Sequence, residues 1–319
     1  MHPSWPAAEH IADLASAIPD SVHFGTSSWT YPGWSGLIYE REYPKTGASA
    51  RMLGEYASWP LFRTVGIDSF FYRPASAKVL ASYAEELPEG FRCVSKVWDR
   101  ITAHTFANPR EKDRWGEPNP DWLSTELFQN EVLGPMQQHF GDHLGPLILE
   151  FQTIAKKSAI DGAAFAGHLD RFFSALPRSA PFAVEIRNQE FLCPEYFAVL
   201  REHGVGHVFN AWTRMPPIGE QLVLHDAITA PFIVSRALLR PGRTYAKAVD
   251  AFAPYDHVQD ENPVLRADLA ALAKASVELR IPAYLLVNNR AEGCAPLTIV
   301  AVAERLARDI KAAARRAAG

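Results

Sequence analysis

Eight short apolar runs, separated by longer segments with helical periodicity, constrain the fold of this chain more than any other feature of its sequence. In the intervening segments, apolar residues recur three and four positions apart, which is typical of amphipathic helices. The connection between the sixth and seventh runs has the weakest helical pattern. The runs predict strands at residues 22–27, 62–68, 91–97, 146–151, 181–186, 205–210, 231–236 and 282–288. The intervening segments predict helices at residues 48–58, 75–86, 121–140, 159–175, 194–203, 263–280 and 297–315.

The alternation of strands and helices predicts right-handed βαβ units and a parallel sheet. Eight such units close a barrel, and 319 residues suit a barrel of about 250 residues that carries insertions. We therefore expect an α/β protein whose residues 1–319 form a single parallel (β/α)8 TIM-like barrel. Its core spans about 22–308, and residues 1–20 form an N-terminal helical extension. An open doubly wound sheet is the alternative.

Two predicted connections are longer than a barrel needs. They cover residues 105–121, after the third strand, and residues 237–262, after the seventh. Both follow the carboxyl end of a strand, which is the end where barrel enzymes place their active sites. We interpret them as lids over such a site, with structureless insertions as the alternative.

Composition and cysteine usage indicate a globular protein of the cytoplasm. The net charge of −4 and the pI near 6.3 disfavour strong non-specific binding to polyanions. Cys93, Cys193 and Cys294 are widely separated and in no metal-ligand spacing, so we expect reduced thiols and no metal site. The N-terminus has no signal-peptide pattern, and no run reaches the eighteen or so apolar residues of a membrane span, so no membrane contact is expected.

The strand at residues 181–186 continues into a carboxylate and a guanidinium two positions apart. Side chains alternate between the two faces of a strand, so Val184 and Ile186 are predicted to pack against helices. Glu185 and Arg187 then share the opposite face, inside the barrel and at its mouth. Because Arg187 is expected to keep Glu185 ionised, the pair favours a base or a positioning role for Glu185.

The other strand ends are polar as well, and parallel strands converge at one mouth. They contribute Ser27 and Trp29, Asp68, Lys96 and Trp98, Glu150 and Gln152, Asn210 and Trp212, Arg236, and Asn288 with Asn289. The predicted catalytic residues are Glu185, Arg187, Lys96, His104 and Glu150. The predicted substrate-binding residues are Trp29, Tyr31, Asp68, Asn210, Trp212, Arg236, Arg243, Asn288 and Asn289. Ion pairs that hold the barrel together without doing chemistry are the alternative reading.

Three loops add to the predicted mouth. Trp29, Tyr31 and Trp34 after the first strand could stack on a ligand or plug the barrel end. The loop after the seventh strand carries Arg240 and Arg243, and the loop after the eighth carries Asn289. Barrels commonly bind phosphate at these two loops, so together with Arg236 they predict an anion site. No glycine-rich nucleotide fingerprint is present, and we expect no cofactor.

With these residues assembled, the chain resembles the YecE-like proteins, a bacterial and archaeal family called domain of unknown function 72. The resemblance spans about residues 22–308 and is carried by FGTSSWTYPGWSG, VGIDSFFYRPAS, FRCVSKVWDRITAH, LGPLILEFQ, FAVEIRNQEF and YLLVNNRAEGCAPLTI. It implies a TIM-like barrel but no particular reaction. The mouth residues that it implies are Trp29, Tyr31, Lys96, His104, Glu185, Arg187, Arg236, Asn288 and Asn289.

The chain departs from the family pattern at four positions. Gly66 stands where many members have a glutamate, and Asp68 stands where they have an asparagine. Asn188 replaces a histidine, and Asn210 replaces a frequent aspartate. A mechanism that needs those missing groups cannot be transferred to this chain.

The mouth residues favour an enzyme that acts on a small anionic substrate bearing a sugar or a phosphate. Glu185 would act as general base or acid, and Lys96 would stabilise negative charge or act as an amine nucleophile. One alternative is a nucleic-acid-binding or nucleic-acid-processing barrel, with Trp29, Trp98 and Trp212 stacking on bases. A glycosidase using Glu150 and Glu185 and a non-catalytic ligand-binding barrel are the others.

Overall fold

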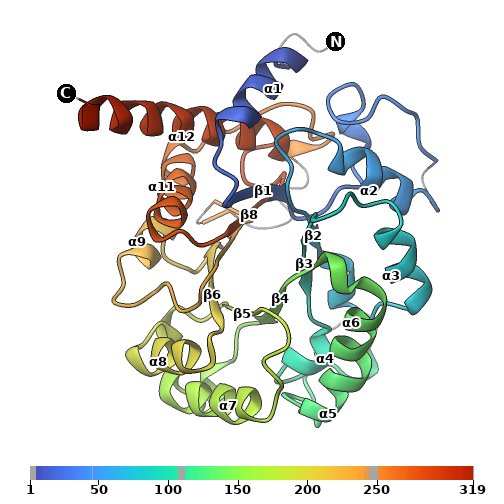
Figure 1. The fold of residues 1–319 in the computed structure, drawn as a ribbon. Coiled ribbons are helices and arrows are strands. Elements are labelled where there is room, and N and C mark those ends of the chain that lie inside the picture. Colours follow the sequence, from blue (N-terminus) through green and yellow to red (C-terminus); the bar gives the residue numbers. More distant parts are fainter. Residues whose placement is uncertain (1–4, 45, 107–111, 241, 244–250, 319) are drawn as a thin grey trace.

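The computed structural model is a nearly closed barrel of eight parallel strands with helices packed around it (Figure 1). It describes residues 5–44, 46–106, 112–240, 242–243 and 251–318. Neighbouring strands pair in the order β1-β8-β7-β6-β5-β4-β3-β2. The strands are β1 (Val22–Thr26), β2 (Gly66–Ile67), β3 (Cys93–Lys96), β4 (Leu144–Phe151), β5 (Phe182–Ile186), β6 (Gly206–Ala211), β7 (Ile233–Ala237) and β8 (Ala283–Val287). This topology confirms the predicted parallel (β/α)8 barrel and not the open sheet.

The barrel closes between β1 and the segment that leads into β2. Phe24 and Phe62 form a bridge there, and the Arg63 amide donates a hydrogen bond to the Phe24 carbonyl oxygen at 2.9 Å. A Cβ atom at Gly25 would lie 2.1 Å from the Thr64 carbonyl oxygen, so this close approach requires glycine. The strand predicted at 62–68 is shorter in the structure, where β2 covers Gly66–Ile67. The Thr64 carbonyl oxygen, just before β2, accepts a hydrogen bond from the Tyr56 hydroxyl at 3.1 Å instead of one from a neighbouring strand.

The helices alternate with the strands and lie outside the barrel (Figure 1). They are α1 (Ala8–Ala17), α2 (Ser49–Ala57), α3 (Ala77–Ala84), α4 (Asp99–Thr102), α5 (Thr125–Phe128), α6 (Gly134–Phe140), α7 (Gly162–Ser174), α8 (Pro194–His203), α9 (Ile218–Leu222), α11 (Pro263–Leu279) and α12 (Ala295–Ala318). The predicted helix at 121–140 is divided into α5, a π-helical turn at Gln129–Leu133 and α6. Pro135 explains the division, because its ring lacks the backbone donor that a continuous α-helix needs.

Local sequence signals fix several helix ends. The Asp161 side chain caps α7 by accepting a hydrogen bond from the Ala164 amide at 2.8 Å. Asn262 caps α11 through the Leu265 amide at 3.2 Å, with Pro263 in the first helical position. Only the short α9 lies between β6 and β7, where the helical pattern was weakest. Parts of the two predicted long connections, residues 107–111, 241 and 244–250, lie outside the described residues.

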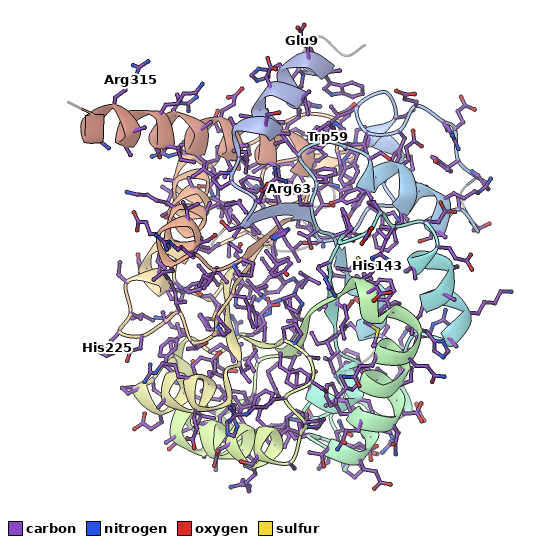
Figure 2. The ribbon with its side chains drawn as sticks, in the orientation of Figure 1. Glu9, Trp59, Arg63, His143, His225 and Arg315 are labelled. Carbon is purple, nitrogen blue, oxygen red and sulfur yellow. The ribbon has the colours of Figure 1, made fainter. Side chains whose placement is uncertain are left out.

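The N-terminal helix is tied to the barrel by Arg63. The guanidinium donates hydrogen bonds to the Ala15 and Pro19 carbonyl oxygens at 3.1 and 2.9 Å, beside the connection from α1 to β1 (Figure 2). The long α12 packs along α1 and then extends past the body of the barrel (Figure 1). In the part of the chain that the structure describes, no helix has the length and apolarity that crossing a membrane requires.

Candidate functional site

On six of the eight strands, the interior of the barrel changes from apolar to charged or amide side chains within two residues. The apolar interior cluster includes Val94, Ile148, Ala183, Val208, Val234 and Leu286. Two positions later on the same strands stand Lys96, Glu150, Glu185, Asn210, Arg236 and Asn288. Because strand side chains repeat their direction every second residue, the second set continues the first toward the carboxyl ends of the strands. We call the two sets the apolar layer and the polar layer.

Glu150 lies at the centre of the polar layer and contacts three cations through one oxygen. Its Oε2 lies 2.8 Å from Lys96 Nζ, 3.1 Å from Arg187 Nη2 and 2.6 Å from Arg236 Nη1. Glu150 and Glu185 face each other in the register of β4 and β5, so two neighbouring carboxylates share these cations. Glu150 on β4 thus contacts side chains at the ends of β3, β5 and β7.

Glu185 and Asp68 complete the network. Glu185 contacts Arg187 Nη2 at 2.8 Å and Arg236 Nη1 at 2.6 Å. Arg236 Nη2 donates to both carboxylate oxygens of Asp68 at 2.9 Å. Arg236 therefore joins β7 to the ends of β2, β4 and β5. We call these six side chains the ionic cluster: Lys96, Arg187, Arg236, Asp68, Glu150 and Glu185.

The ionic cluster is buried and its formal charges balance, with three cations against three carboxylates. Glu150, Glu185, Arg187 and Arg236 are at most 4% exposed. Burial alone would raise the pKa of Glu150, but Lys96, Arg187 and Arg236 together hold that pKa well below the usual glutamate value. Glu150 is therefore ionised throughout the physiological range.

Several buried polar atoms around the cluster have no hydrogen-bond partner in the structure. They are Arg187 Nε and Nη1, Arg236 Nε, Asn210 Oδ1, Ser27 Oγ and Glu185 Oε1, the last of which contacts Arg187 Nη2 only as an ion pair. Most buried polar groups in proteins are paired, so each of these atoms marks an unused donor or acceptor. Four of the six are nitrogen donors or a hydroxyl, which a ligand rich in oxygen acceptors could satisfy, and the other two are acceptors.

Aromatic and apolar side chains cover the ionic cluster. The Trp212 ring lies 4.1 Å from the Arg187 guanidinium carbon, and the Phe71 ring lies 4.0 Å from Lys96 Nζ. Leu239 and Phe252, from the connection after β7, pack against Trp212. The guanidinium and ammonium groups are thereby held in place by cation–π contacts.

The departures from the family pattern have structural counterparts. A Cβ atom at Gly66 would lie 3.0 Å from Ser27 Cα, so a side chain there would crowd β1. Asp68, two residues later, is the carboxylate that reaches Arg236. Asn188 exchanges hydrogen bonds with the Ile154 amide and carbonyl at 2.8 and 3.0 Å and tethers the loop after β4.

The predicted anion-binding loops contain internal partners for their own cations. Arg240 lies 3.1 Å from Asp260, and Arg243 also pairs with Asp260. Asn289 accepts a hydrogen bond from the Ala295 amide at 2.8 Å and thereby caps α12. Asn288 accepts one from the Arg290 amide at 3.0 Å. These four residues lie outside the ionic cluster, and their proposed contact with substrate stays a prediction.

The aromatic loop after β1 packs against the helices. Trp29 Nε1 donates to the Ser49 carbonyl oxygen at 2.8 Å, and its ring meets Tyr83 edge to face at 5.3 Å. Tyr31 contacts Tyr255 with ring centroids 5.6 Å apart. Neither Trp29 nor Tyr31 joins the ionic cluster.

His104 also lies apart from the ionic cluster. Its ring meets the edge of Trp122 at 4.8 Å, and His168 lies 4.8 Å from the same indole. Burial lowers the pKa of His104. Its predicted acid–base role stays a prediction.

Two supporting residues were not among the predicted site residues. Gln152 Nε2 donates to Glu150 Oε1 at 2.5 Å, and its position two residues after Glu150 was the signal that could have found it. Gln221 on α9 donates to the Asn210 carbonyl at 2.8 Å, and no pattern in the sequence pointed to it. Among the described residues, no group of three or more histidine, cysteine, aspartate and glutamate side chains is arranged to hold a metal ion.

A nearly closed parallel barrel with polar side chains at the carboxyl ends of its strands defines a TIM-barrel protein. The family model described as "Protein of unknown function DUF72" matches residues 23–318, and the chain belongs to this family. A search of curated proteins found no match.

Solved structures show the same fold. A DUF72 family protein from Enterococcus faecalis V583 aligns with a TM-score of 0.58 and 17% identity over 89% of this chain and 95% of that one. A DUF72 family protein from Thermotoga maritima MSB8 aligns with a TM-score of 0.57 and 17% identity, over 91% of this chain and 99% of its own. At these identities the likeness concerns the fold alone.

Proposed function

We propose that this barrel is an enzyme acting on a small anionic substrate that carries a sugar or a phosphate, with the ionic cluster as its active site. One observation carries the proposal: two buried arginines, Arg187 and Arg236, keep N–H donors without acceptors inside a layer contributed by several strands. Anionic oxygens of a substrate would supply those acceptors through charge-assisted hydrogen bonds.

The contacts suggest different roles for the two glutamates. Glu150 contacts three cations and its pKa is held low, which suits a fixed template that positions Lys96, Arg187 and Arg236. In the part of the chain that the structure describes, Glu185 forms ion pairs with the two arginines alone, and it is the better candidate for the general base. Lys96 would stabilise negative charge that develops during the reaction.

Charge balance indicates how an anion would enter. Adding an anion to a neutral buried cluster is unfavourable unless one carboxylate leaves its partner. The Asp68 side chain is 30% exposed, and among the described residues Arg236 is its one ion-pair partner, so it is the carboxylate that is easiest to displace. Its departure would free Arg236 Nη2 for the substrate.

Turnover of a library of sugar phosphates, compared between the wild type and Glu185→Gln, tests the proposal. Loss of a general base lowers turnover by about 10²- to 10⁴-fold. Glu195→Gln on the exposed side of α8 is the matched control and should keep full turnover. Equal turnover in wild type and Glu185→Gln would remove Glu185 from the mechanism.

Two further measurements separate the alternatives. A non-catalytic barrel would bind a sugar phosphate in calorimetry without converting it. A nucleic-acid barrel would bind oligonucleotides with an affinity that falls steeply as salt rises. Oligonucleotide binding in place of sugar phosphate binding would favour the nucleic-acid alternative.

A further inference from the structure

Asn210 on β6 is a fully buried member of the polar layer whose side-chain oxygen has no hydrogen-bond partner among the described residues. Its Nδ2 atom donates to the Ile186 carbonyl oxygen at 3.1 Å, on the neighbouring strand β5. That bond distinguishes the two ends of the amide, because the nitrogen is the end that donates to a carbonyl. Oδ1 is therefore the free end, and it can only accept a hydrogen bond.

Gln221 on α9, which is also fully buried, holds the backbone of Asn210. Its Nε2 donates to the Asn210 and Pro216 carbonyl oxygens at 2.8 and 2.7 Å, and its Oε1 accepts from the Asn210 amide at 3.3 Å. His207 Nε2 lies 3.3 Å from the same Oε1, and the Tyr196 hydroxyl lies 3.0 Å from the other ring nitrogen of His207. Contacts with the backbone and with the amide nitrogen thus fix the direction of Asn210 Oδ1.

The free acceptor lies near two arginines that keep unused donors. Asn210 pairs in register with Arg236 on β7, and its bond to Ile186 ends one residue before Arg187. Within the described part of the chain, Arg236 Nε and Arg187 Nε and Nη1 are buried without partners, and neither guanidinium donates to Asn210 Oδ1. An unused acceptor and unused donors therefore occur on neighbouring strands without satisfying one another.

A hydroxyl group can satisfy both kinds of atom. It donates one hydrogen bond and accepts up to two, so it can donate to Asn210 Oδ1 while it accepts from an arginine. A carboxylate or a fully ionised phosphate has only acceptors and would leave Oδ1 unpaired, which weakens binding. An ammonium group could donate to Oδ1, but the arginine cations would repel it.

We propose that the substrate carries a hydroxyl group next to its anionic group, and that Asn210 Oδ1 accepts a hydrogen bond from this hydroxyl. Gln221 is then the residue that positions Asn210. The inference rests on the proposed function, because it assigns the substrate of the ionic cluster to the hydroxylated anions, such as polyol phosphates and sugar phosphates. Simple alkyl phosphates and carboxylates fall outside this class.

Calorimetric titration of the full chain with glycerol 3-phosphate and with propyl phosphate tests the inference, since the two ligands differ only in their hydroxyl groups. We expect the wild type to bind glycerol 3-phosphate at least about tenfold more tightly, because propyl phosphate leaves a buried acceptor unpaired. Asn210→Leu should abolish this preference by weakening glycerol 3-phosphate alone. Gln221→Met should reduce the preference while propyl phosphate keeps its affinity, which general damage to the fold would not produce.

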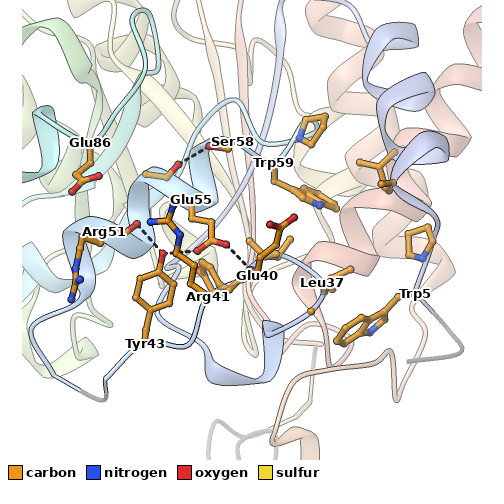
Figure 3. Close-up of a pocket in the computed structure, with 18 residues that line it drawn as sticks. Trp5, Leu37, Glu40, Arg41, Tyr43, Arg51, Glu55, Ser58, Trp59 and Glu86 are labelled. Atoms are coloured by element: carbon orange, nitrogen blue, oxygen red, sulfur yellow. Dashed lines mark hydrogen bonds between the residues drawn. The ribbon is translucent and has the colours of Figure 1, made fainter. Parts of the chain in front are cut away.

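Two control variants lie away from the barrel mouth. A separate cavity of about 850 Å³ lies beside α2, outside the barrel (Figure 3). Its charged lining residues are Arg41, Arg51, Glu40, Glu55 and Glu86. Because carboxylates outnumber arginines there, the cavity does not favour an anion, and Arg51→Gln should change neither affinity. Asn130→Leu, at an exposed asparagine in the π-helical turn, is the matched control for Asn210→Leu and should also change neither.

Arg187→Gln separates this inference from the proposed function. If it weakens both ligands while the wild type binds them equally well, the hydroxyl inference is wrong and the anion site stands. A preference that persists in Asn210→Leu would overturn the inference in the same way. Unchanged binding of both ligands in Arg187→Gln would place the anion outside the ionic cluster and overturn the proposed function together with the inference. Absence of saturable binding of either ligand to the wild type would also overturn both.

Discussion

The apolar layer and the polar layer of the barrel interior occupy the same strands and the same face, yet they contribute differently to the protein. The apolar layer gains stability from burial, because removing hydrocarbon from water is favourable. The ionic cluster, which contains the charged members of the polar layer, places three cations and three carboxylates in a largely buried environment, where desolvation opposes their attraction. Well-packed apolar residues would serve stability as well or better. The difference supports the proposed functional role of the ionic cluster, with the apolar layer contributing stability.

The largest effect is expected from Arg236→Met, which removes the one cation shared by Asp68, Glu150 and Glu185. Three carboxylates would remain with less compensation, and breaking a buried ion pair costs about 3–5 kcal/mol of unfolding free energy. Urea denaturation measures the loss. The control is Arg201→Met, whose exposed pair with Asp226 should be worth about 1 kcal/mol or less. Equal losses in the two variants would show that the carboxylates of the ionic cluster do not depend on Arg236 for compensation.

A somewhat smaller loss is expected from Ile148→Ala, which opens a cavity in the apolar layer two residues before Glu150. Such truncations of buried residues cost about 2–5 kcal/mol, and the loss should not depend on pH between 5 and 8. Leu279→Ala, at a leucine that is 53% exposed, should change stability far less. If Ile148→Ala were as mild as Leu279→Ala in denaturant melts, the apolar layer would not be the stabilising one.

Acid should distinguish the layers through Glu150. Its pKa in the folded protein lies below the ordinary value of 4.5, so its ionised form adds stability that is complete above that pH. This stability is lost as pH falls from about 4.5 toward the folded pKa. Glu150→Gln lacks the effect, and its stability deficit against wild type should shrink as pH falls below 4.5. Denaturant melts across this range measure it, and Ile148→Ala should show a constant deficit. A Glu150→Gln deficit that stayed constant would contradict the assignment.

Local patterns predicted the strands that carry the polar layer. Alternation in β5 placed Glu185 inside the barrel, and the same argument placed Lys96, Glu150 and Arg236 there. Each prediction needed only the chain direction and the pleat of one strand. The helix break at Pro135 and the shortening of β2 arise from local competition for hydrogen bonds, which periodicity alone does not report.

Contacts between distant segments could not be predicted in this way. The pairing of Arg236 with Asp68 joins residues far apart in the chain and depends on how the barrel closes. Asp260 neutralises Arg240 and Arg243 because the loop folds back on itself, and Asn289 turns to cap α12. In each case the sequence identified polar residues without identifying their partners.

The smallest change in stability, and the sharpest change in binding, is expected from Asp68→Asn. The aspartate side of its pair with Arg236 is 30% exposed and asparagine keeps one acceptor for the guanidinium, so the substitution should cost about 1–3 kcal/mol, less than the loss of Arg236 itself. The substitution leaves the ionic cluster with one excess positive charge.

That charge should strengthen the binding of an anion. Two unit charges 4 Å apart interact by about 1 kcal/mol in water and by about 4 kcal/mol near a protein surface, so inorganic phosphate should bind at least about tenfold more tightly to Asp68→Asn than to wild type. Isothermal titration measures this gain, and Asp226→Asn, which removes a carboxylate from the surface pair with Arg201, should show none. An unchanged affinity in Asp68→Asn would mean that Asp68 does not occupy the place of a substrate anion. The balanced charges of the ionic cluster would then serve the stability of the fold and not substrate binding.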